Sequence, residues 1–454
     1  MRLITLLFFF CVFCASGQND TAYYNFFGGE KDDYFESVIQ NDDKSFSILG
    51  NTSSYGNGET DILLINLDSN LKLISSFTLG TENIDEVKEF KKVNNKIYFA
   101  GKTNAWGNGG YDIYLAKTKI NGDIIWEKTI GNESWDDLID IDIKKNSILL
   151  LGEIIEDGMN KTTLMNLDTN GNILQKLVLD SLGTLKYSDI LNLGNNSFFL
   201  TGFSADSLNI NFILQKLNRD NINNFIFDKK YLFNESQKII NGSINNGDIY
   251  MVGESNFISK TNNFDYYLTK LDTLGTFNWS SHFGSSTVGN DLGNDVIFFN
   301  DTIYTIGSTN SYGAGMNDFY FIYCNKSGNY LNGTTFGFPR EDLGKKIIKT
   351  KKWTYLFGDS QDFGINYFDI LIIKTKGIFA SPPKKFQLNN LNSPNVISKL
   401  NKLNPRTNKE FDRKEFYNLI GQQIKFSNEL KGIYFVKYFQ NGELKYIVKE
   451  YFPN

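Results

Sequence analysis

The chain has 454 residues, of which 41% are apolar and 21% charged, and its formal net charge is −5. Its length exceeds that of a usual single domain of about 100–200 residues, and the apolar fraction is sufficient for a sizeable core. The acidic balance disfavours nucleic-acid binding, for which a basic surface is typical.

Residues 1–17 have the features of a secretory signal peptide. Arg2 provides the positive start, Leu3–Val12 is a short apolar run, and Ala15–Gly17 supplies small residues for cleavage. The apolar run is shorter than the roughly 20 residues that cross a bilayer, so we expect cleavage rather than anchoring. The sequence thus predicts a mature chain that begins at Gln18, with no membrane span.

The cysteine and histidine content restricts the chemistry. After cleavage only Cys324 remains, so no internal disulfide is expected, and a strand cysteine is typically a small buried hydrophobe. The single histidine, His282, excludes paired-histidine metal sites and argues against Ser-His-Asp catalysis. We interpret His282 as an ordinary sheet residue.

A short apolar phrase that ends at a glycine returns seven times at intervals of 50 to 54 residues. The repeated glycines are Gly50, Gly101, Gly152, Gly202, Gly253, Gly307 and Gly358. A fixed period of this length indicates stacked supersecondary units. Four strand-like runs between turn residues fill each repeat, which predicts an all-β, seven-bladed β-propeller.

The first two repeats show the expected strand layout. The first predicts strands at Tyr34–Gln40, Ser45–Leu49, Asp61–Leu67 and Leu71–Leu79. The second predicts strands at Val87–Lys92, Lys96–Ala100, Asp112–Lys119 and Asp123–Ile130. The seventh repeat supplies only three strands, so we expect Tyr23–Phe27 to complete the last blade and close the ring.

The repeats resemble the SBBP β-propeller repeat family over residues 23–377. The matching segments are Phe27-Gly28-Gly29, Phe99-Ala100-Gly101, Asp112-Ile113-Tyr114-Leu115-Ala116-Lys117 and Asp265-Tyr266-Tyr267-Leu268-Thr269-Lys270. Repeats three and four depart from the pattern, with Lys161 and Asn211 where aspartate is expected. The resemblance implies the propeller architecture and no particular activity.

Beyond the propeller (18–377), we expect a linker over 378–402 and a C-terminal module over 403–454. The module resembles the sorting domain of proteins exported by the type IX secretion system of Bacteroidota. The matching residues are Gly421, Gly432, Tyr434, Phe435 and Val436. Alternating strands around a turn predict a small β-sandwich. The resemblance implies the type IX machinery as a partner, and a secreted or outer-surface location after Sec-dependent export.

The loops between the second and third strands are the most patterned segments. In four repeats an aromatic residue precedes an aspartate by six positions. The aromatics are Tyr55, Trp106, Tyr312 and Phe363, and the aspartates are Asp61, Asp112, Asp318 and Asp369. One hypothesis is a glycan-stacking or cation-binding face. The other is structural: rings plug the gaps between blades and aspartates cap their loops. Repetition in several blades favours the structural interpretation.

The sequence therefore predicts the general class of function and no specific ligand. We expect a secreted or cell-surface binding or adhesion protein with a glycan or protein ligand. No catalytic residue, metal site or cofactor is assigned, and calcium binding stays open. The alternative is a polysaccharide hydrolase or lyase that uses carboxylates, for which adjacent acids such as Asp32-Asp33 or Asp136-Asp137 are candidates. A deep pocket of non-repeated acids would favour the enzyme.

Overall fold

The computed structural model describes residues 21–376 with short gaps, together with the backbone of several strands on either side. The gaps fall at 121, 145, 157, 181–183, 195, 206–209, 232–235, 257–262, 285–288 and 363–366. The described part of the chain is composed of strands, and none of its segments is a helix long and apolar enough to cross a membrane.

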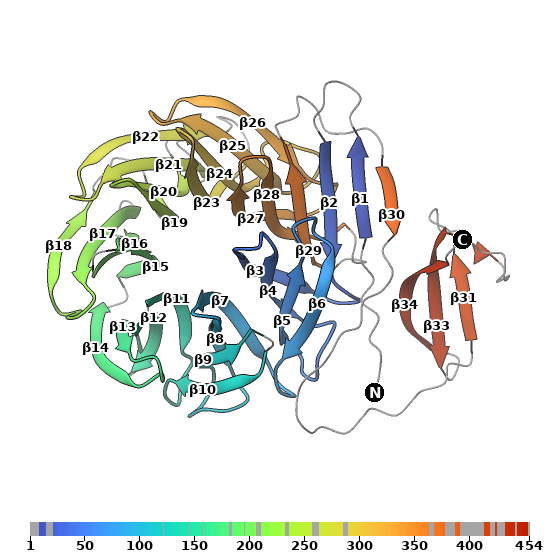
Figure 1. Cartoon of the computed structure of the whole chain (residues 1–454), viewed down its shortest axis with the longest axis horizontal. Helices are drawn as coiled ribbons and strands as arrows, with labels where there is room; N and C mark the ends of the chain where they lie inside the picture. Colours follow the sequence, from blue (N-terminus) through green and yellow to red (C-terminus); the bar gives the residue numbers. More distant parts are fainter. Residues whose placement is uncertain are drawn as a thin grey trace.

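Seven antiparallel sheets stand around a common axis, which confirms the predicted seven-bladed propeller (Figure 1). The first blade consists of β3 (Asp33–Gln40), β4 (Phe46–Thr52), β5 (Asp61–Leu67) and β6 (Leu73–Leu79). The second consists of β7 (Asp85–Val93), β8 (Lys96–Thr103), β9 (Asp112–Lys119) and β10 (Ile124–Ile130). The third consists of β11 (Asp137–Lys144), β12 (Ser147–Glu156), β13 (Met159–Leu167) and β14 (Ile173–Asp180).

The later blades repeat this meander, with the first strand innermost (Figure 1). The fourth consists of β15 (Leu185–Asn192), β16 (Ser197–Ala205), β17 (Ile210–Asn218) and β18 (Phe225–Lys230). The fifth consists of β19 (Gln237–Asn245), β20 (Asp248–Ser255), β21 (Asp265–Asp272) and β22 (Phe277–Phe283). The sixth consists of β23 (Asp291–Phe299), β24 (Thr302–Thr309), β25 (Asp318–Asn325) and β26 (Tyr330–Phe336).

The seventh blade is closed by the N-terminal strand, as predicted. Its own strands are β27 (Asp342–Lys349), β28 (Thr354–Ser360) and β29 (Asp369–Thr375), and β2 (Thr21–Phe27) pairs with β29 from Ala22 opposite Thr375 to Phe27 opposite Ile370. The backbone of β1 (Phe9–Cys14), inside the predicted signal segment, pairs with β2 and with β30 (Phe386–Asn390). The backbones of β1 and β30 thus extend the outer edge of blade seven, beyond β2.

The repeated glycine lies inside the second strand and not at its end, which corrects the sequence-based boundary. Each innermost strand carries a β-bulge opposite this glycine, as between Phe35 and Ser37 or between Val87 and Glu89. The bulge pushes a strand-one carbonyl toward the glycine, so that a methyl group at Gly50 would overlap the carbonyl oxygen of Tyr34. The glycine recurs because the bulge leaves no room for a side chain.

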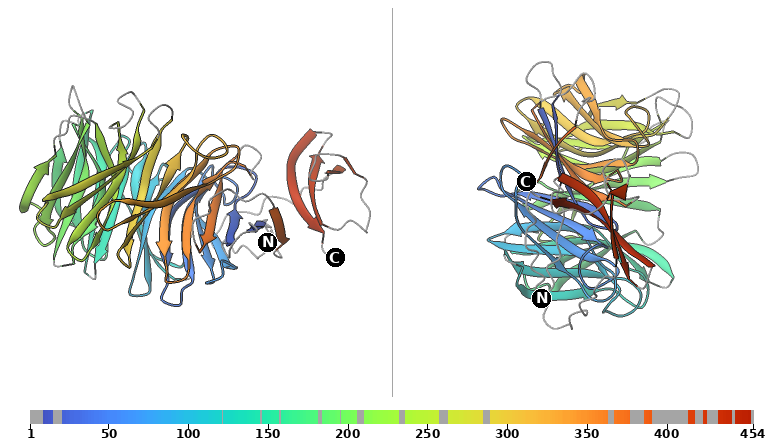
Figure 2. Two further views of the ribbon diagram at one scale, coloured as in Figure 1. Left: turned by 90° about the horizontal axis from the view of Figure 1, so that it is seen from above. Right: turned by 90° about the vertical axis from the view of Figure 1, so that its right-hand side faces the viewer.

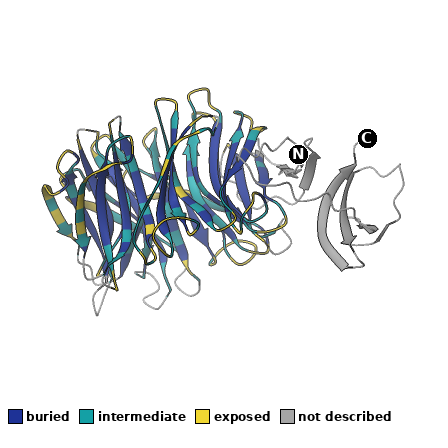
Figure 3. Cartoon of the chain, turned by 90° about the horizontal axis from the view of Figure 1, so that it is seen from below, coloured by how far each residue is buried: buried dark blue, intermediate teal, exposed yellow. Residues whose placement is uncertain are grey.

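The core lies between neighbouring blades, so each blade is buried on both faces. Buried side chains form a continuous band through the ring, with exposed residues at the loops and on the outer strands (Figure 3). Aromatic pairs join the blades: Phe35 stacks on Phe357 at 5.6 Å between blades one and seven, and Tyr250 stacks on Phe298 at 5.3 Å between blades five and six. This packing is what one meander alone cannot provide.

The C-terminal segment contributes strands β31 (Arg413–Tyr417), β32 (Gln423–Ile424), β33 (Gly432–Gln440) and β34 (Glu443–Phe452). Their backbones form one antiparallel sheet in the order β32-β31-β33-β34, apart from the propeller sheets (Figure 2). The predicted β-sandwich stays a prediction. Of the predicted sorting residues, Gly432, Tyr434, Phe435 and Val436 lie on β33, and Gly421 lies outside the described residues.

Because β2 closes the ring, removal of a buried β2 side chain should lower the stability of the protein strongly. Phe26 is 2% exposed and packs 5.9 Å from Phe338 of the neighbouring blade. We expect Phe26→Ala to lower the free energy of unfolding by about 3–5 kcal/mol, as large-to-small core changes do. Ile74→Ala on the outer strand of blade one, where Ile74 is 61% exposed, is the control, with a change within about 0.5 kcal/mol. Equal denaturation midpoints for both variants would contradict the closure.

Candidate functional site

Loops from two neighbouring blades meet on one face of the ring. At five of the seven blade junctions, as far as the structure describes them, the amide of an aspartate at or just before the first strand donates to the carbonyl just before strand three of the preceding blade, at 2.6–2.9 Å. The bonds run from Asp33 to Phe368, Asp85 to Thr60, Asp136 to Tyr111, Asp291 to Phe264 and Asp342 to Asn317. We call this repeated bond the junction bond. It ties the predicted loops to the next blade.

The predicted aspartates are buried, and Asp61 and Asp318 cap their own loops. Asp61, Asp112 and Asp318 are at most 1% exposed, and Asp369 is 6% exposed. Asp61 Oδ2 accepts the amides of Asn57 and Gly58 at 2.9 Å, and Asp318 Oδ2 accepts the amide of Ala314 at 2.9 Å. Burial raises the pKa of Asp61 and of Asp318 to about 6. These carboxylates hold the loop backbone and do not face solvent.

The predicted aromatics differ from one another. Tyr55 is 8% exposed, and its hydroxyl donates to the carbonyl of Gly28 at 2.7 Å, so it is wedged between blades. Trp106 and Tyr312 are 38% and 44% exposed, and their rings lie over Tyr114 and Tyr320 of their own blades. Phe363 lies outside the described residues. The hydroxyl of Tyr312 donates to the carbonyl of Gly284 at 2.8 Å, as that of Tyr55 does to Gly28. The wedge interpretation therefore fits Tyr55 and, with a more exposed ring, Tyr312, whereas Trp106 presents its ring to solvent.

An exposed ring that the repeat pattern did not reveal stacks edge-on against a half-buried tyrosine at the junction of blades two and three. Trp135, in the connection between blades two and three, is 68% exposed, and its ring meets Tyr111 edge-on at 5.2 Å. The ammonium of Lys102 lies 5.3 Å from the centre of the Tyr111 ring. We call Tyr111 and Trp135 the aromatic cluster. Trp135 occurs once and not in every repeat, so only its exposure identifies it.

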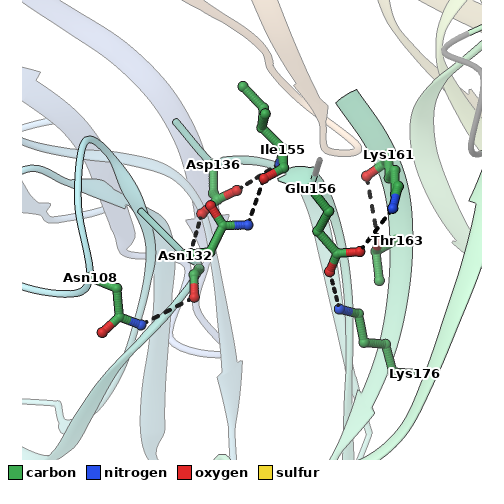
Figure 4. A network of polar contacts seen from close by, with 9 residues as sticks. Asn108, Asn132, Asp136, Ile155, Glu156, Lys161, Thr163 and Lys176 are labelled. Carbon is green, nitrogen blue, oxygen red and sulfur yellow. Dashed lines mark hydrogen bonds and ion pairs between the residues drawn. The ribbon is translucent and has the colours of Figure 1, made fainter. Parts of the chain in front are cut away.

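Hydrogen bonds of Asn132 and Asp136 fix the loop that carries Trp135 (Figure 4). The amide of Asn132 donates to Asp136 Oδ2 at 2.7 Å, and the side-chain amide of Asn132 donates to the carbonyl of Ile155 at 2.6 Å. Gly110 donates to the carbonyl of Ser134 at 3.0 Å, which ties the two loops together. The exposed rings are therefore held in place before any ligand arrives.

A second candidate site is the central channel, where the bulges place one side chain per blade. These channel residues are Ser37, Glu89, Asp140, Asp189, Asn241, Asp295 and Lys346. Most of them line a cavity of about 310 Å³. Their periodic placement was not predicted, because the polar residue type changes from blade to blade and only its position repeats.

Channel carboxylates join successive inner strands. Asp140 Oδ2 accepts the amide of Ile190 at 2.8 Å, and Asp189 Oδ2 accepts the amide of Gly242 at 3.0 Å. Burial, and then the neighbouring Asp140 carboxyl, raise the pKa of Asp189 well above its usual range. The lysines Lys91 and Lys346 lie among these acids. The channel is therefore a mixed-charge ring, in which the side chains of Asp189 and Asp140 share a hydrogen bond.

The remaining sequence-based candidates have structural surroundings. His282 lies on β22 with its ring 5.1 Å from that of Tyr267, and burial lowers its pKa to about 4. Cys324 is a buried free thiol on β25, and burial raises its pKa to about 12. Among the described residues, no three His, Cys, Asp or Glu side chains converge as a metal site. The hypothesis of ligand binding by the repeated loop residues stays a prediction.

The raised pKa of Asp189 predicts the sign of a pH effect. A folded-state pKa above the unfolded value of about 3.9 gives stability that is present at low pH and lost as pH rises through the folded pKa. Asn in place of Asp189 keeps an acceptor for the Gly242 amide and an N–H donor for Asp140. We therefore expect Asp189→Asn to flatten the fall of the melting temperature between pH 5 and 9. The exposed Asp42→Asn serves as control, and a steeper fall for Asp189→Asn would refute the assignment.

Comparison with known proteins is limited to the fold. No family model matches the sequence, and no curated protein is similar to it. Among solved structures, the chain is similar to the phage phi92 endosialidase at 10% identity and a TM-score of 0.46, over 94% of this chain and 86% of that one. This likeness carries nothing about activity. The chain is a seven-bladed β-propeller, and its proposed function rests on its own residues.

Proposed function

We propose that this chain is an exported binding protein whose propeller captures a glycan on the loop face that carries the aromatic cluster. The observation that carries the proposal is Trp135, 68% exposed on a hydrogen-bonded loop. Trp135 and the Tyr111 ring that it meets form an apolar surface in fixed geometry, which is suited to contact with a ligand.

The surroundings of the aromatic cluster suit a sugar. Flat rings of Trp and Tyr offer an apolar face beside polar groups, which matches the apolar faces and hydroxyl edges of a saccharide. Lys102 borders the cluster, with its ammonium 3.2 Å from Glu86, and Asn108 reaches the carbonyl of Gly131 at 3.3 Å. These groups supply the donors and acceptors that hydroxyls require.

Trp135→Ala tests this proposal. We expect the purified propeller to bind at least one glycan on an array, and Trp135→Ala to weaken that binding at least tenfold with an unchanged melting temperature. Tyr330→Ala, which removes a 52% exposed ring from outer strand β26, is the matched control and should bind like the parent. Glycan binding that survives Trp135→Ala, or a parent that binds no glycan, would contradict the proposal.

Carboxylate catalysis in the central channel is the second candidate, and the cavity lined by Glu89, Asp140, Asp189 and Asp295 favours it. Glycoside hydrolysis needs two carboxyls that are free to reach the substrate. Here Asp140, Asp189 and Asp295 each accept an inner-strand amide from the next blade, at 2.8–3.0 Å. Because these acids serve the fold, binding is the better-supported function.

We also propose that residues 403–454 direct export by the type IX machinery. In support, the propeller ring closes without them, and their strands form a sheet of their own. Removal of residues 403–454 should leave a folded propeller in the periplasm of its host. The same segment, placed behind a signal peptide and a fluorescent carrier, should take the carrier across the outer membrane. Normal extracellular levels of the truncated protein would refute the sorting role.

A further inference from the structure

Acidic residues at the blade junctions occur in pairs. Each junction brings together the first residue of strand three in one blade and a first-strand residue of the next. Five junctions hold two aspartates: Asp61 with Asp85, Asp112 with Asp136, Asp265 with Asp291, Asp318 with Asp342, and Asp369 with Asp33. The other two junctions have no aspartate at these two positions, with Lys161 and Leu185 at one and Asn211 and Gln237 at the other. At the first of these, the fourth-strand Asp180 accepts the amide of Leu185 at 2.6 Å instead. Residues that only capped separate loops would be free to vary separately, so the pairing indicates a shared task.

A glycine accompanies each pair. Gly28, Gly80, Gly131, Gly284 and Gly337 occupy the end of the preceding fourth strand at the five acidic junctions. A methyl group at Gly131 would overlap both Asp112 Oδ1 and Asp136 Oδ2. A methyl group at Gly337 would overlap Asp318 Oδ1 and lie 2.9 Å from Asp342 Oδ2. Oxygens from two carboxylates therefore converge over one glycine, close enough for a single ion to bridge them.

One oxygen of each third-strand carboxylate faces this convergence. Oδ2 of Asp61, Asp112 and Asp318 accepts loop amides, whereas Oδ1 of each is buried without a hydrogen-bond partner among the described residues. A buried, unsatisfied carboxylate oxygen is costly. A cation that lies between the two carboxylates would satisfy these oxygens and neutralise their charge.

We propose that the five acidic junctions are divalent-cation sites of the calcium type, in which two aspartates from neighbouring blades bridge one ion. Calcium prefers carboxylate and carbonyl oxygens and tolerates irregular geometry, and water or loop carbonyls complete its shell. Sites with only two carboxylates fit the weak extracellular class, with Kd of roughly 10⁻⁴–10⁻³ M. The ions join the blades at the same places as the junction bond.

Calcium itself is the probe. The purified full-length protein, freed of metal with EDTA, is titrated with CaCl₂ in a calorimeter and melted in EDTA, CaCl₂ or MgCl₂. We expect about five calcium ions per chain and a melting temperature that is several degrees higher in millimolar calcium than in EDTA. The double variant Asp318→Asn, Asp342→Gln copies the natural pair Asn211 and Gln237, so it is expected to fold and to bind one ion fewer.

A control variant carries the same change of charge in an exposed turn, Asp42→Asn with Asp43→Asn, and should keep the full number of ions. If the double variant at the junction does not fold, the number of calcium ions that the parent protein binds still tests the proposal. A parent that binds no calcium and melts at one temperature in EDTA and calcium overturns the proposal, and the carboxylate pairs then share a proton. An equal loss of ions in the control variant overturns it as well.

Discussion

The junction bond is the contact on which the ring depends, because it joins one blade's third strand to the next blade's first. In a propeller each meander buries its faces only against its neighbours, so the geometry of each junction sets the geometry of the whole ring. Five junctions share the same backbone bond, and the aspartate that donates it also fixes the preceding turn, as when Asp33 Oδ2 accepts the amide of Gly29 at 2.6 Å. The loops that carry the predicted site residues on this face each end at such a junction bond.

A second set of contacts joins the blades around the central channel. The bulge in each inner strand turns a polar side chain toward the channel, and the channel residue of one blade reaches the inner strand of the next, as Asp295 does to the amide of Ile347 at 2.9 Å. The same bulge explains the repeated glycine on the second strand, because the displaced carbonyl occupies the space of a side chain. The repeated glycine and the polar lining of the channel therefore both follow from the β-bulge in the inner strand.

Much of this fold could be predicted from the sequence, because the glycine period and the turn residues are local and repeat. The closing strand was predictable as well, since the seventh repeat lacked a fourth strand and the N-terminus offered one. The candidate site was harder to predict from the sequence. Repetition favoured a loop-capping role for Asp61 and Asp318, which their bonds to loop amides fit, but the sequence did not reveal how deeply they are buried. Trp135 occurs once, so no repeat comparison could single it out.

The central claim is that five junctions are clamped by the junction bond and the aspartate pair, and that the two junctions without the pair are weaker. Native-state hydrogen exchange, followed by mass spectrometry of peptides, tests it most directly, because local opening is reported region by region. The account predicts that segments across the third–fourth and fourth–fifth junctions, around Lys161–Leu185 and Asn211–Gln237, exchange before those across the other five. Uniform protection around the ring, or earliest exchange at the β2–β29 closure, would contradict it.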